Sequence, residues 1–293
     1  MQLNWILLTF LSILFMTIGI SISKKLLFKL DPLQILFYQY IASIVSVFIQ
    51  GTIREGWIFF DIENCWLISL GFLFGLGVFA TNKAFQINLS RSVIVNQFTS
   101  VVAVIFSMIF LREYLLFDPR TMSGLLMIFA VPLAIFSVFL MKGFGRGEIG
   151  KRWLIWCITF VLILGFATFL VKVFVTNKSF LEVLFFQYIG SFIIVSLGEL
   201  FAKKNLSLGK SDILQASLVG IFLSFSLSCL YQAFSIAPLA YVNTLQTVGF
   251  TITGVISGLL VFREKETLNL KSVIGMLVGF GAVILIVISN LVQ

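Results

Sequence analysis

Ten apolar segments, each close to the length that crosses a lipid bilayer, occupy most of this 293-residue chain. A transmembrane helix needs about 20 predominantly apolar residues. Only 11% of the residues are charged, whereas a typical soluble domain carries about 25%. We therefore predict an all-α polytopic membrane protein with ten transmembrane helices, at roughly 3–28, 34–50, 65–87, 93–111, 121–141, 153–175, 181–200, 213–235, 239–262 and 272–291.

The chain also repeats itself. The sequence LFYQYIAS at 36–43 returns as LFFQYIGS at 184–191, which is 148 residues further on. Lys24 lies the same distance before Lys172, and a lysine is an unusual residue to find twice inside long apolar segments. These repeated segments indicate a duplicated unit of five spans.

An odd number of spans in each unit decides how the two units are oriented. Because five is odd, the second unit enters the membrane from the opposite face. The two repeats are then inverted, and a pseudo-two-fold axis in the membrane plane relates them. We predict one five-helix repeat over residues 1–145 and a second over 150–293, with the two copies of the repeated motif toward opposite membrane faces.

The positions of the basic residues indicate how the chain is oriented in the membrane and which partner suits its net charge of +8. Cytoplasmic termini would leave 5 of the 20 Lys and Arg residues inside, whereas external termini would leave 15. The positive-inside rule therefore favours external termini. Basic residues in short connections also suit lipid headgroups, so we predict a lipid bilayer and no nucleic acid as partner. The first apolar segment has no basic residues before it and no small-residue cleavage site after it, so we interpret it as a span.

Missing residue types remove several function classes. The chain has no His, and its three Cys are widely spaced, so no metal pattern or disulfide framework is present. No Asp or Glu lies in the middle of a predicted span, which disfavours a proton-driven exporter of cations. No nucleotide-binding loop of the Walker type occurs. We predict no catalytic residue, no metal and no cofactor, and thus not an enzyme.

Polar residues inside the predicted spans are the candidates for a transport pathway. A lysine there either extends to the headgroups or faces a polar path. Lys83, close to the end of its span, is expected to reach the headgroups. Unpaired amides in lipid cost several kcal/mol, so they should face protein or a cavity. A tyrosine at this depth fits either a cavity or an interfacial belt. The candidate substrate-cavity or gate residues are Lys24, Gln39, Tyr40, Asn96, Gln97, Lys172, Gln187, Tyr188, Tyr241, Asn243 and Gln246.

Two glutamates and several glycines have structural interpretations. Glu113 and Glu264 each follow an Arg at the end of a predicted span, where an ion pair could hold a tight turn, so we predict both as structural ion-pair residues. Glycines four residues apart allow close helix packing, which we expect within a monomer or a weak dimer. These pairs are Gly71 with Gly75, Gly254 with Gly258, and Gly275 with Gly279.

The five-plus-five duplication and an LxE-like signature ending the fourth helix of each unit, at 111–113 and 262–264, resemble the drug/metabolite transporter superfamily. The EamA-domain branch is the most similar, and the resemblance covers essentially the whole chain. It implies two inverted five-helix repeats around a central cavity built mainly from the first four helices of each unit. The fifth and tenth helices would pack at the back. It also implies alternating access by rocking of the helices.

Individual residues match this family and depart from it. The family often has a lysine late in its first helix, which Lys24 and Lys172 match. It often has a proline opening the second helix and a basic residue seven positions later. Pro32 matches, but Gln39 and Gln187 stand where the base is expected. The repeated motif is therefore where we expect the substrate preference to differ from that of relatives.

The predicted function is a secondary transporter of small organic metabolites, such as amino acids or related polar compounds, in a bacterial inner membrane. An alternative is a carrier of quaternary-ammonium or other cationic, drug-like compounds, for which the 34 Phe could supply an aromatic cage. A remote alternative is a non-transporting receptor or scaffold. An intramembrane enzyme would need a nucleophile–base pair or a metal cluster at membrane depth, which the sequence does not offer.

Overall fold

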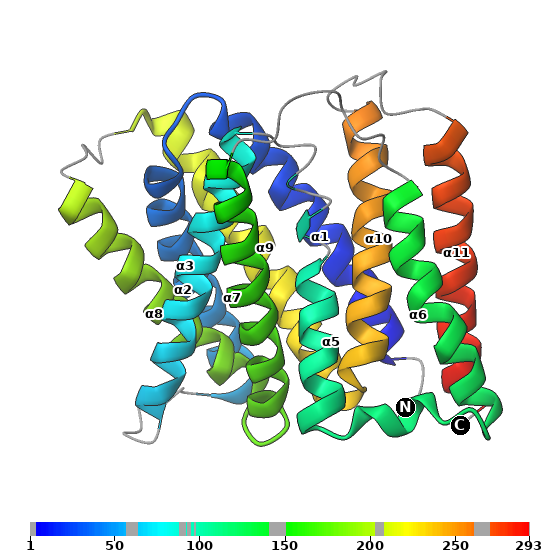
Figure 1. Cartoon of the computed structure of the whole chain (residues 1–293). Helices are drawn as coiled ribbons and strands as arrows, with labels where there is room; N and C mark the ends of the chain where they lie inside the picture. Colours follow the sequence, from blue (N-terminus) through cyan, green and yellow to red (C-terminus); the bar gives the residue numbers. More distant parts are fainter. Residues whose placement is uncertain are drawn as a thin grey trace.

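A computed structural model describes residues 4–56, 64–87, 92, 95–96, 98–140, 151–202, 208–260 and 270–292. Within these residues it has ten α-helices, one short 3-10 helix and no strand (Figure 1). The first half contains α1 (Asn4–Leu27), α2 (Pro32–Glu55), α3 (Cys65–Ile87), α5 (Phe98–Phe110), η2 (Glu113–Phe117) and α6 (Met122–Leu140). The second half contains α7 (Lys151–Val175), α8 (Phe180–Ala202), α9 (Lys210–Ile236), α10 (Leu239–Leu260) and α11 (Leu270–Leu291). Each α-helix coincides with one predicted segment, so the all-α prediction is confirmed.

Six of these helices are long and apolar enough to cross a bilayer, namely α1, α2, α3, α7, α8 and α9. The apolar stretches found in α5, α6 and α11 are shorter. The chain is therefore a multi-pass membrane protein, while the count of ten spans stays a prediction.

The two halves run in opposite directions (Figure 1). Helix α1 begins at the lower edge, beside the N-terminus, and the equivalent helix α7 begins at the upper edge. Both ends of the chain lie at the lower edge. This is the geometry expected for two repeats that each contain an odd number of helices.

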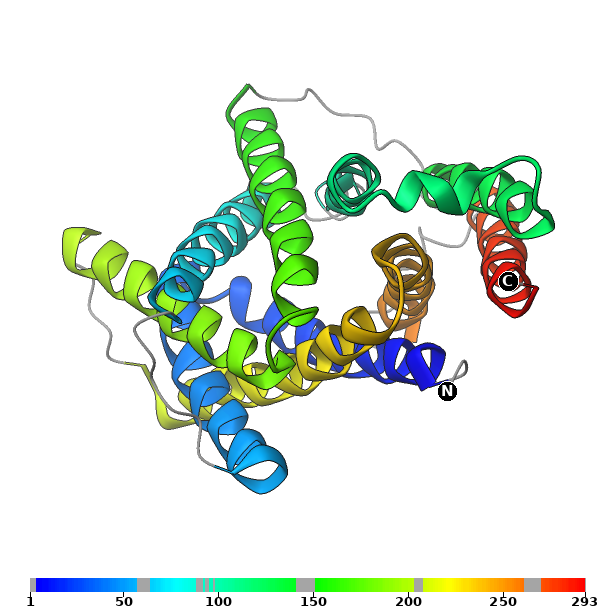
Figure 2. The same cartoon turned by 90° about the horizontal axis from the view of Figure 1, so that it is seen from below.

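Equivalent helices of the two halves make equivalent contacts with the opposite half. Helix α1 packs on α9 as α7 packs on α3, and α2 packs on α9 as α8 packs on α3. Equivalent helices also meet directly, α2 with α8 and α6 with α11. Figure 2 shows α6 and α11 together at one side of the bundle. Most of the packing joins one half to the other, so the halves share a core; the repeat boundaries 1–145 and 150–293 stay predictions.

The repeated motif forms two equivalent helix crossings. The Ser43 hydroxyl of α2 donates a hydrogen bond to the Gly220 carbonyl of α9, at 3.0 Å. The Ser191 hydroxyl of α8 donates to the Gly71 carbonyl of α3, at 2.8 Å. Each bond joins the second helix of one half to the third helix of the other. Part of the motif is therefore repeated because it packs the two halves together.

Both crossings require glycine because the helix backbones nearly touch. A Cβ atom added to Gly71 would lie 2.2 Å from the Gln187 carbonyl oxygen. A Cβ atom on Gly220 would lie 2.2 Å from the Gln39 carbonyl oxygen. A Cβ atom on Gly75 would meet the Ile194 side chain of α8 at the same distance. The Gly71 and Gly75 pair thus packs within the chain, as the sequence predicted.

Replacing either crossing glycine by alanine should destabilise the protein by about 1–3 kcal/mol, because the helices must separate to admit the methyl group. Gly71→Ala and Gly220→Ala should behave alike, since the two sites are equivalent. The control is Gly281→Ala in α11, where an added Cβ atom meets nothing within 4 Å. That change should be neutral or stabilise by up to about 1 kcal/mol. Thermal unfolding in detergent measures all three variants, and equal losses in all three would contradict the crossing geometry.

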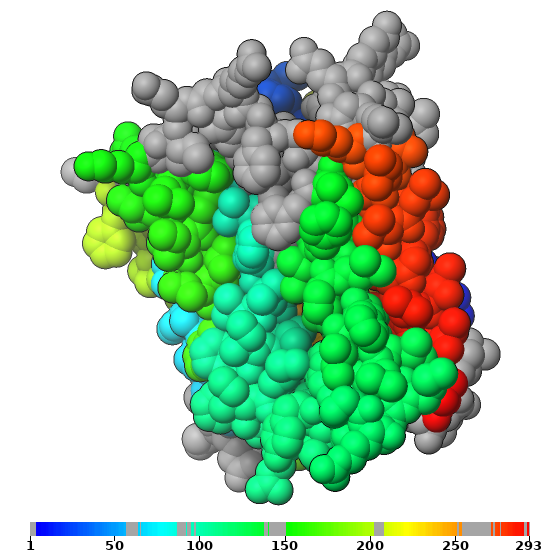
Figure 3. Space-filling view, turned by 45° about the vertical axis from the view of Figure 1, so that its right-hand side comes forward, coloured from blue at the N-terminus to red at the C-terminus, as the bar shows by residue number. Residues whose placement is uncertain are grey.

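The outer surface is apolar, as contact with lipid requires. Figure 3 shows one such face, where α5, α6 and α11 lie side by side. Large apolar side chains are exposed on these helices, including Ile105, Ile109, Phe110, Leu125, Phe129, Phe136, Leu277, Phe280 and Ile284. Soluble monomers rarely expose apolar patches larger than a few hundred Å². This face therefore suits the hydrocarbon core of a membrane.

Candidate functional site

The break between α9 and α10 is the shortest connection in the second half of the chain, and it spans residues 237–238. Ala237 has an extended backbone (φ −139°, ψ 156°), which a following proline favours. Pro238 has no N–H and no polar side chain, so it cannot cap α10. The last carbonyls of α9 and the first amides of α10 therefore need partners from elsewhere.

Glu113 provides the partners for α10. Its Oε1 accepts a hydrogen bond from the Leu239 amide at 2.8 Å, and its Oε2 accepts one from the Ala240 amide at 3.0 Å. The Ser107 hydroxyl also donates to Oε2 at 3.0 Å, and the glutamate is buried. A carboxylate suits a helix N-terminus, where the helix dipole is positive. Because Glu113 belongs to the first half and α10 to the second, this cap ties the two halves together.

Lys172, in the last turn of α7, provides the partners for α9. Its Nζ donates hydrogen bonds to the Phe234 carbonyl and, at 2.8 Å, to the Ala237 carbonyl. A cation suits a helix C-terminus, where the dipole is negative. Lys172 also interacts electrostatically with Glu113. We call this arrangement of Glu113 and Lys172 around the α9–α10 break the charged bracket. The equivalent lysine, Lys24, lies partly buried in the last turn of α1, at the opposite edge (Figure 1).

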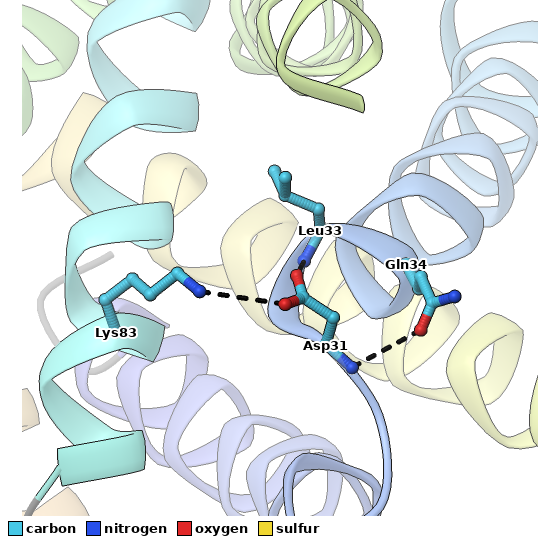
Figure 4. Close-up of polar contacts among 4 residues, drawn as sticks. All are labelled: Asp31, Leu33, Gln34 and Lys83. Atoms are coloured by element: carbon cyan, nitrogen blue, oxygen red, sulfur yellow. Dashed lines mark hydrogen bonds and ion pairs between the residues drawn. The ribbon is translucent and has the colours of Figure 1, made fainter. Parts of the chain in front are cut away.

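An ion pair lies at the start of α2 (Figure 4). Asp31 caps this helix: its Oδ1 accepts a hydrogen bond from the Leu33 amide at 3.0 Å, and the Gln34 side chain accepts one from the Asp31 amide. Lys83 of α3, predicted to reach the headgroups, has its Nζ 3.7 Å from Asp31 Oδ2. The sequence Asp-Pro-x-Gln at 31–34 is a helix-start signature that indicates this cap.

The two copies of the repeated motif, predicted to lie toward opposite membrane faces, instead meet where α2 crosses α8. The rings of Tyr40 and Tyr188, both buried, have centroids 6.0 Å apart. Gln187 Oε1 accepts a hydrogen bond from the Tyr231 hydroxyl of α9 at 2.5 Å, and Gln39 is buried. Sequence reasoning missed Tyr231, because the first half has no tyrosine at the equivalent position and the repeat gave no signal.

Helices α5 and α10 bring several uncharged polar side chains together. Asn243 Nδ2 donates to the Ser100 carbonyl at 3.4 Å, and the Thr247 hydroxyl donates to the Ser100 hydroxyl at 2.5 Å. Gln246 Nε2 contacts the Met16 sulfur of α1 at 3.8 Å. We call Ser100, Asn243, Gln246 and Thr247 the polar cluster. It joins the fourth helices of the two halves.

Two neighbouring regions extend this polar character. Thr17 of α1 and Thr253 of α10 share a hydrogen bond between their hydroxyls, at 2.7 Å. Asn96 precedes α5 and is partly buried. Gln97, another predicted cavity residue, lies outside the described residues, and so does Glu264.

Tyr241 contacts a different set of helices from those joined by the polar cluster. It is completely buried, and its hydroxyl lies 3.5 Å from the Ser123 hydroxyl of α6 and 3.3 Å from the Ser289 hydroxyl of α11. Its ring stacks on Trp5, with centroids 6.1 Å apart. These contacts fasten α10 to the fifth helices of both halves. A gating role for Tyr241 stays a prediction.

Metal and thiol chemistry find little support in the part of the chain that the structure describes. No group of three or more Cys, Asp or Glu residues there could hold a metal ion. Cys157 and Cys229 are free thiols in α7 and α9.

Comparison with known proteins agrees with this architecture. The sequence matches the model of the EamA-like transporter family over residues 3–141 and again over 151–288, once in each half. A solved structure described only as "Crystal structure of protein" has a TM-score of 0.77, covers 95% of this chain and 94% of its own, and is 12% identical. That likeness concerns the fold alone. A comparison with curated proteins finds no match.

The family match covers most of the chain and confirms the resemblance drawn from the sequence. The chain belongs to the EamA-like transporter family, and it is therefore a membrane transporter of the drug/metabolite transporter superfamily. Proteins of this family are transporters and not enzymes, and they act on small molecules in a lipid environment.

Proposed function

We propose that this protein is a secondary transporter that moves small polar organic metabolites across a bacterial inner membrane by alternating access. The polar cluster is the observation that carries this proposal. An amide in lipid needs hydrogen-bonding partners, yet the contact of Asn243 with the Ser100 carbonyl is long, at 3.4 Å, and Gln246 donates to a thioether sulfur, which is a weak acceptor. Each amide has two donor hydrogens and an acceptor oxygen. These side chains therefore have hydrogen-bonding capacity to offer a substrate.

The residues of the cluster indicate the substrate class. Its four side chains are amides and hydroxyls, which both donate and accept hydrogen bonds and carry no formal charge. A substrate without net charge, such as a zwitterionic amino acid or a related polar compound, suits such a site. Lysines near opposite membrane faces, Lys24 and Lys172, can interact with its carboxylate on entry or exit.

The charged bracket suggests how one face is held during transport. It fixes the end of α9 and the start of α10 to α7 and to the first half of the chain. Rocking of α10 requires Glu113 to release the Leu239 and Ala240 amides. In the sequence repeat, Lys24 and Glu264 correspond to Lys172 and Glu113, so we propose that they act in the same way at the opposite face. In this proposal the two brackets form in turn.

A metabolite library tested by thermal shift, followed by flux of the hits in proteoliposomes, tests the proposed function. For a transported hit, Asn243→Ala and Gln246→Ala should each raise KM about 3- to 10-fold, the effect of losing one neutral hydrogen bond. The matched control is Ser137→Ala in α6, whose buried hydroxyl bonds the Ala134 carbonyl of its own helix at 2.7 Å. This variant should keep the KM of the parent protein.

Other outcomes of the same screen would overturn the proposal. Transport of quaternary-ammonium compounds, with no polar metabolite transported, would favour recognition by an aromatic cage. A well-folded protein that carries no compound but captures a protein partner would favour a receptor or scaffold. Unchanged KM values in both amide variants would remove the polar cluster from the substrate site.

A further inference from the structure

A pocket of about 480 Å³ lies between the end of α1 and the start of α9, away from the residues discussed above. These helices are antiparallel, so both of these helix ends lie at the upper edge of the molecule (Figure 1). Among the described residues, the pocket is lined by Ile22, Lys25, Leu26, Lys29, Gln215 and Leu218. Three of them are polar and three are apolar.

The polar and apolar residues occupy different parts of the pocket. Lys25 lies in the last turn of α1 and Lys29 follows the helix, and both are exposed, so the pocket has two positive charges on its exposed side. Leu26 is only 1% exposed and packs with Ala216 and Val219 of α9, which gives the pocket an apolar floor. None of the described residues that line it carries a carboxylate. The pocket therefore combines two positive charges with an apolar interior.

An apolar surface continues from the pocket toward the middle of the membrane. Leu14 and Ile18 of α1 are 53% and 36% exposed, and they lie on the same helix face as Ile22. Ile221 and Phe225 of α9 are 37% and 40% exposed beside them. Lys25 lies eleven positions after Leu14, which corresponds to about 16 Å along α1. This is about half of a 30 Å hydrocarbon core, and thus about the depth of one leaflet.

We propose that this pocket and the apolar surface below it bind one anionic phospholipid. Its phosphate lies between Lys25 and Lys29, and an acyl chain lies along α1 and α9. The charge of the pocket complements an anionic headgroup, and an ammonium group close to such a headgroup strengthens binding about fivefold. The predicted orientation places this edge at the cytoplasmic side, where anionic lipids create a negative surface potential. This site is separate from the polar cluster, so it does not depend on the proposed substrate.

Lipid titration of the purified full-length protein in neutral detergent tests the site. Phosphatidylglycerol should bind and raise the melting temperature, whereas phosphatidylcholine should do so far less. The double variant Lys25→Gln/Lys29→Gln should bind phosphatidylglycerol about 25-fold more weakly, with its melting temperature unchanged in lipid-free detergent. The matched control is Lys271→Gln, which removes an exposed lysine from the start of α11 at the same edge. This control should retain full binding.

Three results would overturn the proposal. Equal binding of phosphatidylcholine would show that the headgroup charge is not recognised. Equal loss in Lys271→Gln would show that only the total charge of this edge matters. Full protection by inorganic phosphate alone would assign the pocket to a free phosphate and not to a lipid. None of these readouts involves transport, so they are independent of the test of the proposed function.

Discussion

Glu113→Ala should lower the free energy of unfolding by about 3–5 kcal/mol, the largest loss that we expect from a single substitution in this protein. The substitution leaves the buried amides of Leu239 and Ala240 without an acceptor and Lys172 without its electrostatic partner. Each buried group left without its acceptor, the two amides and the Ser107 hydroxyl, costs about 1–3 kcal/mol. Denaturant titration in mixed micelles measures the change. A parallel loss of transport is expected, because α10 also carries most of the polar cluster.

Two further variants give the Glu113 prediction its controls. Glu113→Gln keeps one acceptor oxygen, so it should lose only part of the stability. Glu55→Gln removes an exposed carboxylate at the end of α2 that accepts a hydrogen bond from Ser179, and it should change the stability by less than about 1 kcal/mol. If the three variants were equally destabilised, the loss could not be assigned to the cap of α10.

Lys172→Met should lower the free energy of unfolding by about 2–3 kcal/mol and reduce transport at least tenfold. Methionine has a similar length but no donor, so the Phe234 and Ala237 carbonyls at the end of α9 lose their partner. The carboxylate of Glu113 also loses its positive neighbour. Denaturant titration and proteoliposome flux on the same preparation measure the two effects.

A double-mutant cycle tests whether Glu113 and Lys172 stabilise the protein together, as the charged bracket, or separately, as two independent caps. Glu113→Gln with Lys172→Met should cost about 1–3 kcal/mol less than the sum of the single changes, because each single change already disrupts the shared interaction. Strictly additive losses would argue against the bracket. The control is Lys83→Met: its partner Asp31 is partly exposed, and such a pair contributes at most about 1 kcal/mol.

The helices could be predicted because their signal is local. In lipid, a spanning segment must satisfy its own backbone hydrogen bonds, so a long apolar run becomes a helix. The predicted segments agree with the helices within a few residues at most ends; the largest differences are at the end of α2, which continues to Glu55, and at the start of α5, which begins at Phe98. The cap at Asp31 carries a local signature of its own. The opposite directions of the two halves follow from counting five helices in each unit.

The contacts within the site could not be predicted in the same way, because they join side chains far apart in the chain. Glu113 follows an arginine, which indicated an ion pair at a turn, but its carboxylate caps a helix more than one hundred residues later. Lys172 was expected to face either headgroups or a pathway, but it binds backbone carbonyls at the end of α9. The partner of Gln187 is Tyr231, a residue with no repeat signal.

The sequence by itself determined that this chain forms apolar helices in two inverted halves and that it belongs to a transporter family, because periodic hydrophobicity and duplication are properties of the chain. Only the tertiary structure decided what the repeated residues do. Ser43 and Ser191 bind the backbones of Gly220 and Gly71 at two equivalent crossings. Lys172, which the repeat pairs with Lys24, donates hydrogen bonds to the carbonyls at the end of α9. The physical reason is that caps, close crossings and charge pairs depend on distances between helices, which no stretch of sequence contains.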